Sequence, residues 1–315
     1  MGEQISTRAA YGMALAEFGG SENIYVFDAD LKSCTMTQYF AEKYPDRFFN
    51  MGIAEANMVD VAAGFATCGA IALVNTFAIF ASGRVYDQVR NDVVYPGLNV
   101  KVVGSHAGLT VGEDGATHQS LEDISLMRTI PGMTVVVPCD GYETRLATKA
   151  ILEKEGPCYL RTGRCKLDVV TEQAEGYEFE IGKGVTLTDG NDVSIIACGL
   201  MVQESLKAQK LLEAEGIHAR VIDMHTIKPI DRDLVIKAAK ETGAIVTAEN
   251  HQVSCGLGSA VSNVLTDQCL VPLERIGIQE QFGQVGPQDY LMEQYHLLAA
   301  DIVAAAEKAI ARKEK

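Results

Sequence analysis

The chain has 315 residues, 47% of them hydrophobic and 22% charged, which predicts a globular protein long enough for two domains. Its formal net charge of −15 argues against nucleic-acid binding, because a phosphate backbone would repel it, and no apolar run is long enough to span a membrane. The eight cysteines form no Cys-x-x-Cys pair, so we expect reduced thiols in a soluble, cytoplasmic protein and no metal site on this chain.

The first half of the chain alternates between helical and strand patterns. An amphipathic helix opens it, and further helices are predicted at residues 57–69 and 141–155. Continuous apolar runs predict buried strands at residues 23–27, 71–77, 100–105, 134–138 and 158–163. Strands that are apolar on both faces and separated by helices are typical of a parallel sheet with helices on both sides.

A polar, glycine-containing stretch from Lys166 to about Asn191 interrupts this alternation. The pattern then resumes with predicted strands at 192–197, 218–224, 244–250 and 272–278, and with helices at 201–215, 231–242, 257–269 and the C-terminus. We therefore predict an α/β protein with two doubly wound, mainly parallel-sheet domains, of which the second is smaller. The predicted division is a first domain at 1–170, a linker at 171–191 and a second domain at 192–315.

Polar loops follow the predicted strands of the first domain, where open parallel sheets bind their ligands. The loop at residues 105–123 is the longest, and it carries His106, Asp114 and His118. A single histidine in such a loop would most simply be a surface residue. Two imidazoles with a carboxylate can move protons and bind hydroxyl groups, so this loop is the first candidate for an active site.

Three segments together resemble the pyrimidine-binding region of transketolase, a thiamine-diphosphate enzyme. They are GIAEANM (52–58), NTFAIF (75–80) and SHAGLTVGEDGATHQSLED (105–123). The whole chain resembles the C-terminal half of a full-length transketolase, which consists of the pyrimidine-binding and C-terminal domains. Full-length members hold the cofactor diphosphate and a divalent cation on an upstream domain with a Gly-Asp-Gly motif, which this sequence lacks. The resemblance therefore implies one subunit of a split transketolase.

The resemblance also implies which residues contact the cofactor. The glutamate that matches Glu55 hydrogen-bonds a ring nitrogen of the aminopyrimidine and so activates the thiazolium carbon. Desolvation in an apolar pocket raises the proton affinity of such a carboxyl group. The aromatic residues that match Phe77 and Phe80 stack on or wall the same ring. From position alone, Glu55 could instead be a first-turn helix carboxylate, and the two phenylalanines could be core residues.

Sugar-binding residues follow from the same resemblance. His106, Asp114 and His118 match residues that contact substrate hydroxyls, and both histidines are candidates for moving protons. Asp30 matches an acid near the sugar hydroxyls. The phosphate-binding serine expected four residues later falls on Cys34, with Ser33 beside it.

Two arginines are candidates for binding the sugar phosphate, because a guanidinium group binds phosphate through two hydrogen bonds. Arg161 matches a phosphate-binding arginine of the family, and Arg84 matches one in the related deoxyxylulose-phosphate synthases. Each could instead belong to a structural ion pair. Many transketolases have a tyrosine shortly after the position of Phe80, but this chain has Ala-Ser-Gly-Arg there, so a third aromatic wall near Gly83 is not expected.

The implied activity is transfer of a two-carbon ketol unit from a ketose phosphate such as xylulose 5-phosphate to an aldose phosphate such as ribose 5-phosphate, in the pentose phosphate pathway. A partner N-terminal subunit would hold Mg²⁺ or Ca²⁺ and the diphosphate. The two chain types would form a heterotetramer around a self-associated dimer core, and this chain alone would be inactive.

The alternatives are a deoxyxylulose-phosphate synthase-like subunit, a 2-oxo acid dehydrogenase β subunit, or a non-catalytic scaffold. The motifs at 225–231 and 247–251 are expected to pack domains and to form a dimer. Gly256 with Gly258 is too short a motif to indicate a dinucleotide site.

Overall fold

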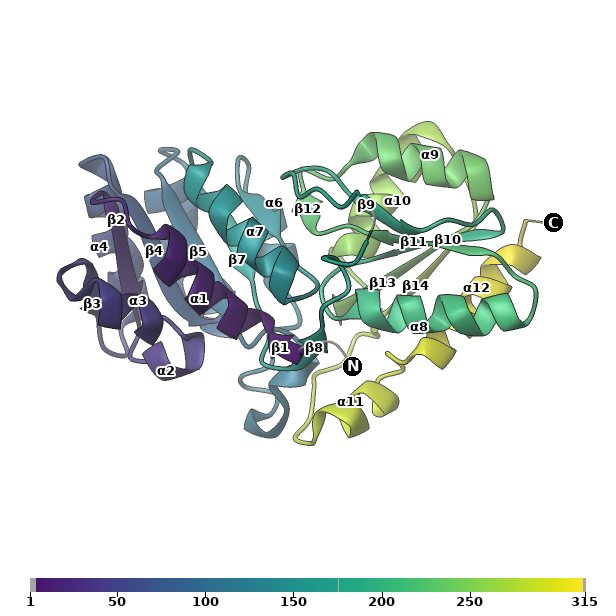
Figure 1. Ribbon diagram of the computed structural model, residues 1–315, viewed down its shortest axis with the longest axis horizontal. Helices are drawn as coiled ribbons and strands as arrows, with labels where there is room; N and C mark the ends of the chain where they lie inside the picture. Colours follow the sequence, from purple (N-terminus) through teal and green to yellow (C-terminus); the bar gives the residue numbers. More distant parts are fainter. Residues whose placement is uncertain (1–3, 175, 314–315) are drawn as a thin grey trace.

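The computed structural model describes residues 4–174 and 176–313, which form two α/β domains lying side by side (Figure 1). The first domain is built on a seven-stranded sheet of order β12-β6-β7-β5-β4-β2-β3, parallel except for β12. Its strands are β2 (Ile24–Asp28), β3 (Phe48–Asn50), β4 (Ile71–Phe77), β5 (Val100–Ser105), β6 (Thr134–Val136), β7 (Cys158–Arg161) and β12 (Thr226–Lys228). The apolar runs of the sequence therefore form the central strands, as predicted.

Helices cover both faces of this sheet. One face packs against α1 (Thr7–Phe18), α3 (Gln38–Lys43) and α7 (Gly141–Glu153), with the short α2 (Lys32–Thr35) beside them. The other face packs against α4 (Glu55–Thr67), a helical segment from Ile79 to Val94, and α6 (Asp123–Thr129). That segment consists of a π-helical turn η2 (Phe80–Arg84), α5 (Tyr86–Gln88) and a second π-helical turn η3 (Val89–Val94). Serine and aspartate side chains cap α1 and α7, which explains where these helices begin.

The second domain has a five-stranded sheet of order β14-β13-β10-β11-β9, parallel except for β9. Its strands are β9 (Val185–Thr188), β10 (Val193–Ala197), β11 (Ala219–Asp223), β13 (Ile245–Gln252) and β14 (Leu273–Ile278). Its helices are α8 (Met201–Ala214), α9 (Arg232–Thr242), α10 (Leu257–Gln268), α11 (Gln288–Gln294) and α12 (Ala299–Ala311). Residues 171–191, predicted as a linker, therefore contain a strand of this sheet.

The two domains share structure. Strand β12 comes from the second half of the chain, yet it pairs with β6 at the edge of the first sheet. One hydrophobic cluster also runs through both halves and includes Met127 and Val135 with Ile222 and Val261. A short antiparallel pair, β1 (Gln4–Ser6) with β8 (Lys166–Asp168), joins the two ends of the first domain. These shared elements give the domains a common core.

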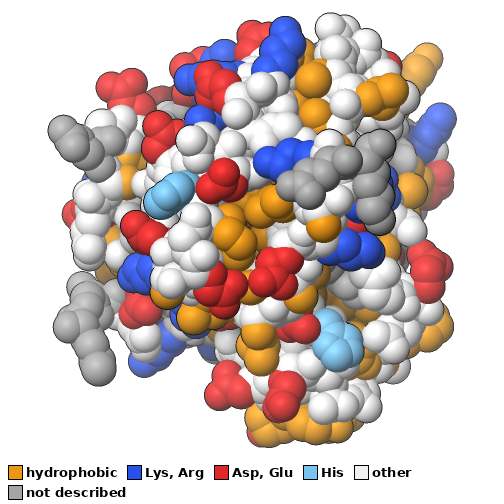
Figure 2. All heavy atoms as spheres, turned by 90° about the vertical axis from the view of Figure 1, so that its right-hand side faces the viewer, with side chains coloured by type: hydrophobic (Ala, Val, Ile, Leu, Met, Phe, Trp, Pro, Cys, Tyr) orange, Lys and Arg blue, Asp and Glu red, His pale blue; other side chains and the backbone are white. Residues whose placement is uncertain are grey.

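The surface of the second domain carries charges of both signs. Figure 2 shows acidic and basic side chains interspersed around smaller apolar areas on this end of the molecule. The negative net charge of −15 is therefore not gathered there into one acidic face. None of the helices in residues 4–174 and 176–313 has the length and apolar character needed to cross a membrane.

Candidate active site

The candidate site lies where β4 and β5 end. Parallel pairing places Phe77, the last residue of β4, opposite Ser105, the last residue of β5. His106 follows directly, and its ring lies 4.1 Å from the ring of Phe77, centroid to centroid. The sheet register therefore brings together two residues that are far apart in the sequence.

Four of the predicted residues form one cluster of rings. The rings of Phe77 and Phe80 are almost parallel, at 11° and with centroids 6.1 Å apart. The imidazole of His118 lies edge-on to both, 5.4 Å from Phe80 and 6.1 Å from Phe77. Phe77 and His106 are buried, whereas Phe80 and His118 are half-buried and so line a surface that a ligand can reach.

Glu55 is connected to this cluster through Arg84. Glu55 is the first residue of α4, and only 4% of its side chain is exposed. Arg84 donates a hydrogen bond from Nη1 to Oε1 of Glu55 at 2.7 Å. The guanidinium carbon of Arg84 also lies 4.1 Å from the ring centroid of Phe80. A buried carboxylate and an accessible aromatic ring therefore lie within reach of one planar group.

His106 is held as a neutral imidazole. Arg8 can only donate, so its contact from Nη1 to Nε2 at 3.2 Å makes Nε2 an acceptor and leaves Nδ1 to donate to Oγ of Ser105, 2.9 Å away. Burial, together with the charges of Arg8 and Arg164, lowers the pKa of His106 to about 3. The prediction that His106 moves protons conflicts with this arrangement, since its lone pair is already bound. An orienting role fits better.

The two predicted acids, Asp114 and Asp30, lie in more open positions. Asp114 ends the 3₁₀ segment η4 (Leu109–Asp114), and its side chain is 42% exposed. Its Oδ2 lies 3.9 Å from Nη1 of Arg164. Asp30 is exposed and accepts a hydrogen bond from Nδ2 of Asn50 at 2.8 Å. The recorded contacts of Asp30 therefore do not include the ring cluster.

Arg161 forms a buried structural ion pair, which contradicts its predicted role as a phosphate ligand. Its Nε and Nη2 donate to the two carboxylate oxygens of Asp123 at 2.8 and 3.1 Å, and Nη2 also donates to the carbonyl of Asn250 at 3.0 Å. Only 7% of the Arg161 side chain is exposed. Burial alone would raise the pKa of Asp123, but Arg161 holds it below its usual range. The guanidinium fork is therefore already bound.

Two arginines that the sequence reading passed over lie at the site instead. Arg8, in the first turn of α1, contacts His106 and donates to the carbonyl of Cys34 at 2.9 Å. Arg164 is 43% exposed, lies near Asp114 and donates to the carbonyl of Val111 at 3.0 Å. An open cleft with Arg164 in its wall adjoins the loop that carries Asp114. The signal for Arg164 was present, because it stands only three residues after Arg161 in the same loop.

Gly83 has open space around it. A β-carbon added there would meet no atom of the described chain within 4 Å.

Two stacked phenylalanines and a buried carboxylate fit the aminopyrimidine half of thiamine diphosphate, with Glu55 as hydrogen-bond partner. The diphosphate half needs a divalent cation with oxygen ligands, and among the described residues the one group of metal-ligand side chains lies elsewhere.

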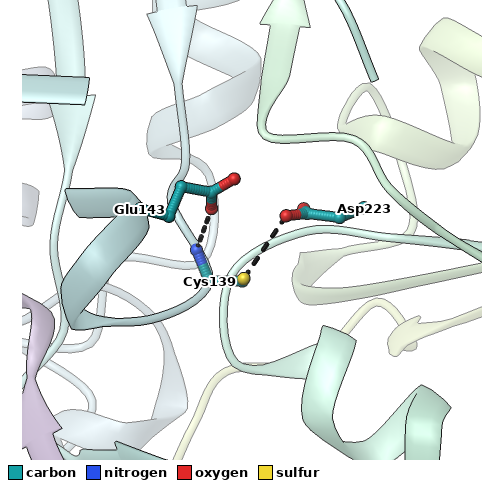
Figure 3. A group of neighbouring side chains, drawn as sticks. All are labelled: Cys139, Glu143 and Asp223. Atoms are coloured by element: carbon teal, nitrogen blue, oxygen red, sulfur yellow. Dashed lines mark hydrogen bonds between the residues drawn. The ribbon is translucent and has the colours of Figure 1, made fainter. Parts of the chain in front are cut away.

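That group is Cys139, Glu143 and Asp223, at the junction of the two domains (Figure 3). The thiol of Cys139 donates to Oδ2 of Asp223 at 3.3 Å, and the backbone N–H of Cys139 donates to Oε2 of Glu143 at 2.6 Å. Burial, and then the charge of Glu143, raises the pKa of Asp223 well above its usual value. We interpret the group as a hydrogen-bonded contact between the domains, in which Asp223 is protonated.

The motif at 247–251 also packs the domains together. Glu249 accepts hydrogen bonds from the backbone N–H groups of Leu257 and Gly258, both at 2.8 Å, so its carboxylate occupies the N-terminus of α10. Asn250 accepts from the N–H of Leu109, at the start of the active-site loop, at 3.0 Å. Gly256 therefore allows the close approach of Glu249, while a β-carbon at Gly258 would meet Thr247 and Arg275. Both glycines thus serve packing within the second domain.

Comparison with known proteins identifies the family. The family "Transketolase, pyrimidine binding domain" matches residues 3–169, and "Transketolase, C-terminal domain" matches residues 182–302. The chain is 48% identical to a "Putative transketolase C-terminal section" of Methanocaldococcus jannaschii, covering 92% of each chain. It is 45% identical to "6-deoxy-6-sulfo-D-fructose transketolase subunit SqwH" of a Clostridium species, covering 99% of this chain and 96% of that one.

A solved structure is similar over the whole length. It is described as "Split gene transketolase, inactive beta4 tetramer", and it is 47% identical with a TM-score of 0.90, covering 99% of this chain and 100% of that chain. The family matches and the fold thus agree. The chain belongs to the transketolase family and comprises its pyrimidine-binding and C-terminal domains.

Proposed function

We propose that this chain is the pyrimidine-binding subunit of a split transketolase that depends on thiamine diphosphate. The reaction would transfer a two-carbon ketol unit from a ketose phosphate such as xylulose 5-phosphate to an aldose phosphate such as ribose 5-phosphate, in the pentose phosphate pathway. The observation that carries this proposal is the buried carboxylate of Glu55, which Arg84 connects to the stacked rings of Phe80 and Phe77. Thiamine diphosphate, when bound, supplies the chemistry that breaks and forms carbon–carbon bonds.

The chain's own residues would then orient the cofactor and handle protons. Glu55 hydrogen-bonds the aminopyrimidine nitrogen, while Phe77 and Phe80 hold the ring by stacking, which contributes about 1 kcal/mol beyond area burial. His118 is the better placed of the two histidines to move a proton at a sugar hydroxyl, because the lone pair of His106 is bound by Arg8. Asp114, exposed near Arg164 in the loop that carries His118, would accept a hydrogen bond from a hydroxyl of the sugar.

Arg8 and Arg164 are the proposed ligands for the anionic end of the sugar. Both lie at the loop that carries His106 and Asp114, and Arg164 keeps an exposed guanidinium group. Arg84 remains a proposed substrate contact, as does Asp30. The name of the Clostridium relative refers to a sulfonated sugar. Because guanidinium groups bind phosphate and sulfonate alike, the assay below includes both kinds of donor.

A partner subunit completes the proposed enzyme. Residues 4–174 and 176–313 show no set of oxygen ligands for a cation beside the ring cluster, so Mg²⁺ or Ca²⁺ and the diphosphate would be held by an N-terminal transketolase subunit. The related C-terminal chain whose structure is solved is described as inactive and as a β4 tetramer. We infer a heterotetramer of two chain types built around self-associated copies of this chain.

The test is a ketol-transfer assay with xylulose 5-phosphate and ribose 5-phosphate, thiamine diphosphate and Mg²⁺. Three samples are assayed: the chain alone, the chain mixed with its candidate N-terminal subunit, and the Glu55→Gln variant mixed with the same subunit. Parallel reactions use 6-deoxy-6-sulfofructose as the donor. We expect turnover only in the mixture and a loss of about 100-fold or more with Glu55→Gln. Turnover by the chain alone would contradict the two-subunit proposal.

Two controls separate the remaining alternatives. A panel of 2-oxo acids tests for a dehydrogenase β subunit, and pyruvate with glyceraldehyde 3-phosphate tests for a deoxyxylulose-phosphate synthase. A non-catalytic scaffold would leave the mixture equally active with wild-type chain and with Glu55→Ala. An intact complex without activity toward any of these substrates would overturn the proposed chemistry.

A further inference from the structure

Arg84 makes two contacts with residues of the candidate site. Its Nη1 donates to Oε1 of Glu55 at 2.7 Å, and its guanidinium carbon lies 4.1 Å from the ring centroid of Phe80. The side chain is nevertheless 48% exposed, whereas Glu55 is 4% exposed. Arg84 thus reaches inward from solvent to a buried carboxylate.

These two contacts are the ones that an aminopyrimidine ring would use. A guanidinium group and an aminopyrimidine that is protonated on its ring nitrogen are both flat and delocalised. Each presents an N–H donor at one edge and a face for stacking. Glu55 offers a carboxylate oxygen as acceptor, and Phe80 offers a half-buried ring. One planar group can therefore contact both Glu55 and Phe80, and in this structure that group is the guanidinium of Arg84.

The local backbone allows Arg84 to leave. Phe80 and Arg84 are the first and last residues of the π-helical turn η2, a distortion that is frequent at functional sites. Gly83, next to Arg84, is exposed and has open space around it. An arginine on such a segment can swing into water without disturbing the buried residues of the turn, Ala81 and Ser82.

We infer that Arg84 is a gate residue, which competes with the aminopyrimidine ring of thiamine diphosphate for Glu55 and Phe80 and must leave both before the ring binds. This inference rests on the function proposed above. Displacement would also free the guanidinium group for the substrate contact proposed for Arg84. The gate sets the affinity and the rate at which the cofactor is taken up, and the carboxylate of Glu55 stays paired until then.

The test is equilibrium binding of thiamine diphosphate with Mg²⁺, measured by titration calorimetry on the full chain in complex with its N-terminal subunit. If Arg84 competes for the site, Arg84→Ala and Arg84→Gln should bind the cofactor about three- to tenfold more tightly than wild type. The gain should shrink as salt is raised from about 0.05 to 0.5 M, because salt weakens the competing ion pair in wild type. Arg90→Ala is the matched control, since Arg90 is exposed on the same helical segment, and its affinity should equal that of wild type.

The outcomes separate the gate from the proposed function. Weaker or unchanged binding by both Arg84 variants, in complexes that melt like wild type, would overturn the gate; weaker binding would mean that Arg84 positions Glu55 for the ring. Glu55→Ala serves as the reference for the site. The proposed function fails if wild type does not bind the cofactor, or if it binds the cofactor no more tightly than Glu55→Ala does. The gate then fails as well.

Discussion

At the scale of the residue, His106 links stability to pH. Burial and two arginines lower its pKa to about 3 in the folded chain, whereas an unfolded chain has the ordinary value near 6.5. Between these values the unfolded state binds one more proton than the folded state. The stability contributed by the neutral imidazole is therefore present above about pH 6.5 and is lost as the pH falls toward 3, at up to about 1.4 kcal/mol per pH unit.

Replacing His106 should reduce the loss of stability at acidic pH. We expect the free energy of unfolding of His106→Asn, measured by urea denaturation, to fall less steeply than that of wild type between pH 6.5 and 4.5, by up to about 1.4 kcal/mol per pH unit. His218, an exposed histidine of the second domain, provides the control variant His218→Asn, which should keep the wild-type slope. Equal slopes for wild type and His106→Asn would show that His106 is not held neutral.

Arg161 and Arg164 make a second pair of predictions, because one is buried and the other exposed. Arg161→Met leaves the carboxylate of Asp123 buried without its partner and should lower the free energy of unfolding by about 3–5 kcal/mol. Arg164→Met should leave the melting temperature almost unchanged but raise the KM for sugar phosphates about tenfold, because a charged hydrogen bond contributes about 1.5–3 kcal/mol. A stable Arg161→Met protein with only a raised KM would restore the sequence-based assignment of Arg161.

At the scale of the element, the N-terminus of α10 depends on a carboxylate from a neighbouring strand. Glu249 lies on β13 and accepts from the N–H groups of Leu257 and Gly258. Glu249→Gln removes the negative charge and one of the two acceptors, so we expect a loss of about 1–2 kcal/mol in the free energy of unfolding. Glu215→Gln, at an exposed position after α8, should change it by less than about 0.5 kcal/mol. If Glu249→Gln left the free energy of unfolding unchanged, the carboxylate of Glu249 would not stabilise the start of α10.

The elements differed in how far sequence could predict them. Strands β4 and β5 have the predicted bounds, because each is an uninterrupted apolar run buried on both faces. Strands β9 and β12 were missed, since both are short antiparallel edge strands whose pairing depends on a partner far along the chain. The helical segment from Ile79 to Val94 was missed as well, because its π-helical turns break the 3.6-residue period.

At the scale of the whole molecule, the two domains should unfold together. Strand β12 completes the first sheet, one hydrophobic cluster runs through both halves, and Arg161 donates to Asn250 across the junction. We expect a single calorimetric transition with equal calorimetric and van't Hoff enthalpies at fixed protein concentration. Lys228→Ala, which removes hydrogen bonds to the carbonyls of Arg128 and Ile130, should lower the temperature of that one transition. Two separate transitions would show that the shared core does not couple the domains.

The sequence by itself determined the class of fold and the chemical types at the site. Periodic apolar runs define buried strands without knowledge of their neighbours, and the motifs around Glu55, Phe77 and His118 indicated the family. Only the tertiary structure decided which polar groups are free. Arg161 and Arg164 are the same residue type in one loop. The guanidinium group of Arg161 is hydrogen-bonded to Asp123, whereas Arg164 lines the open cleft. Hydrogen-bond partners come from segments distant in the chain, so local sequence cannot show whether a charged group is already paired.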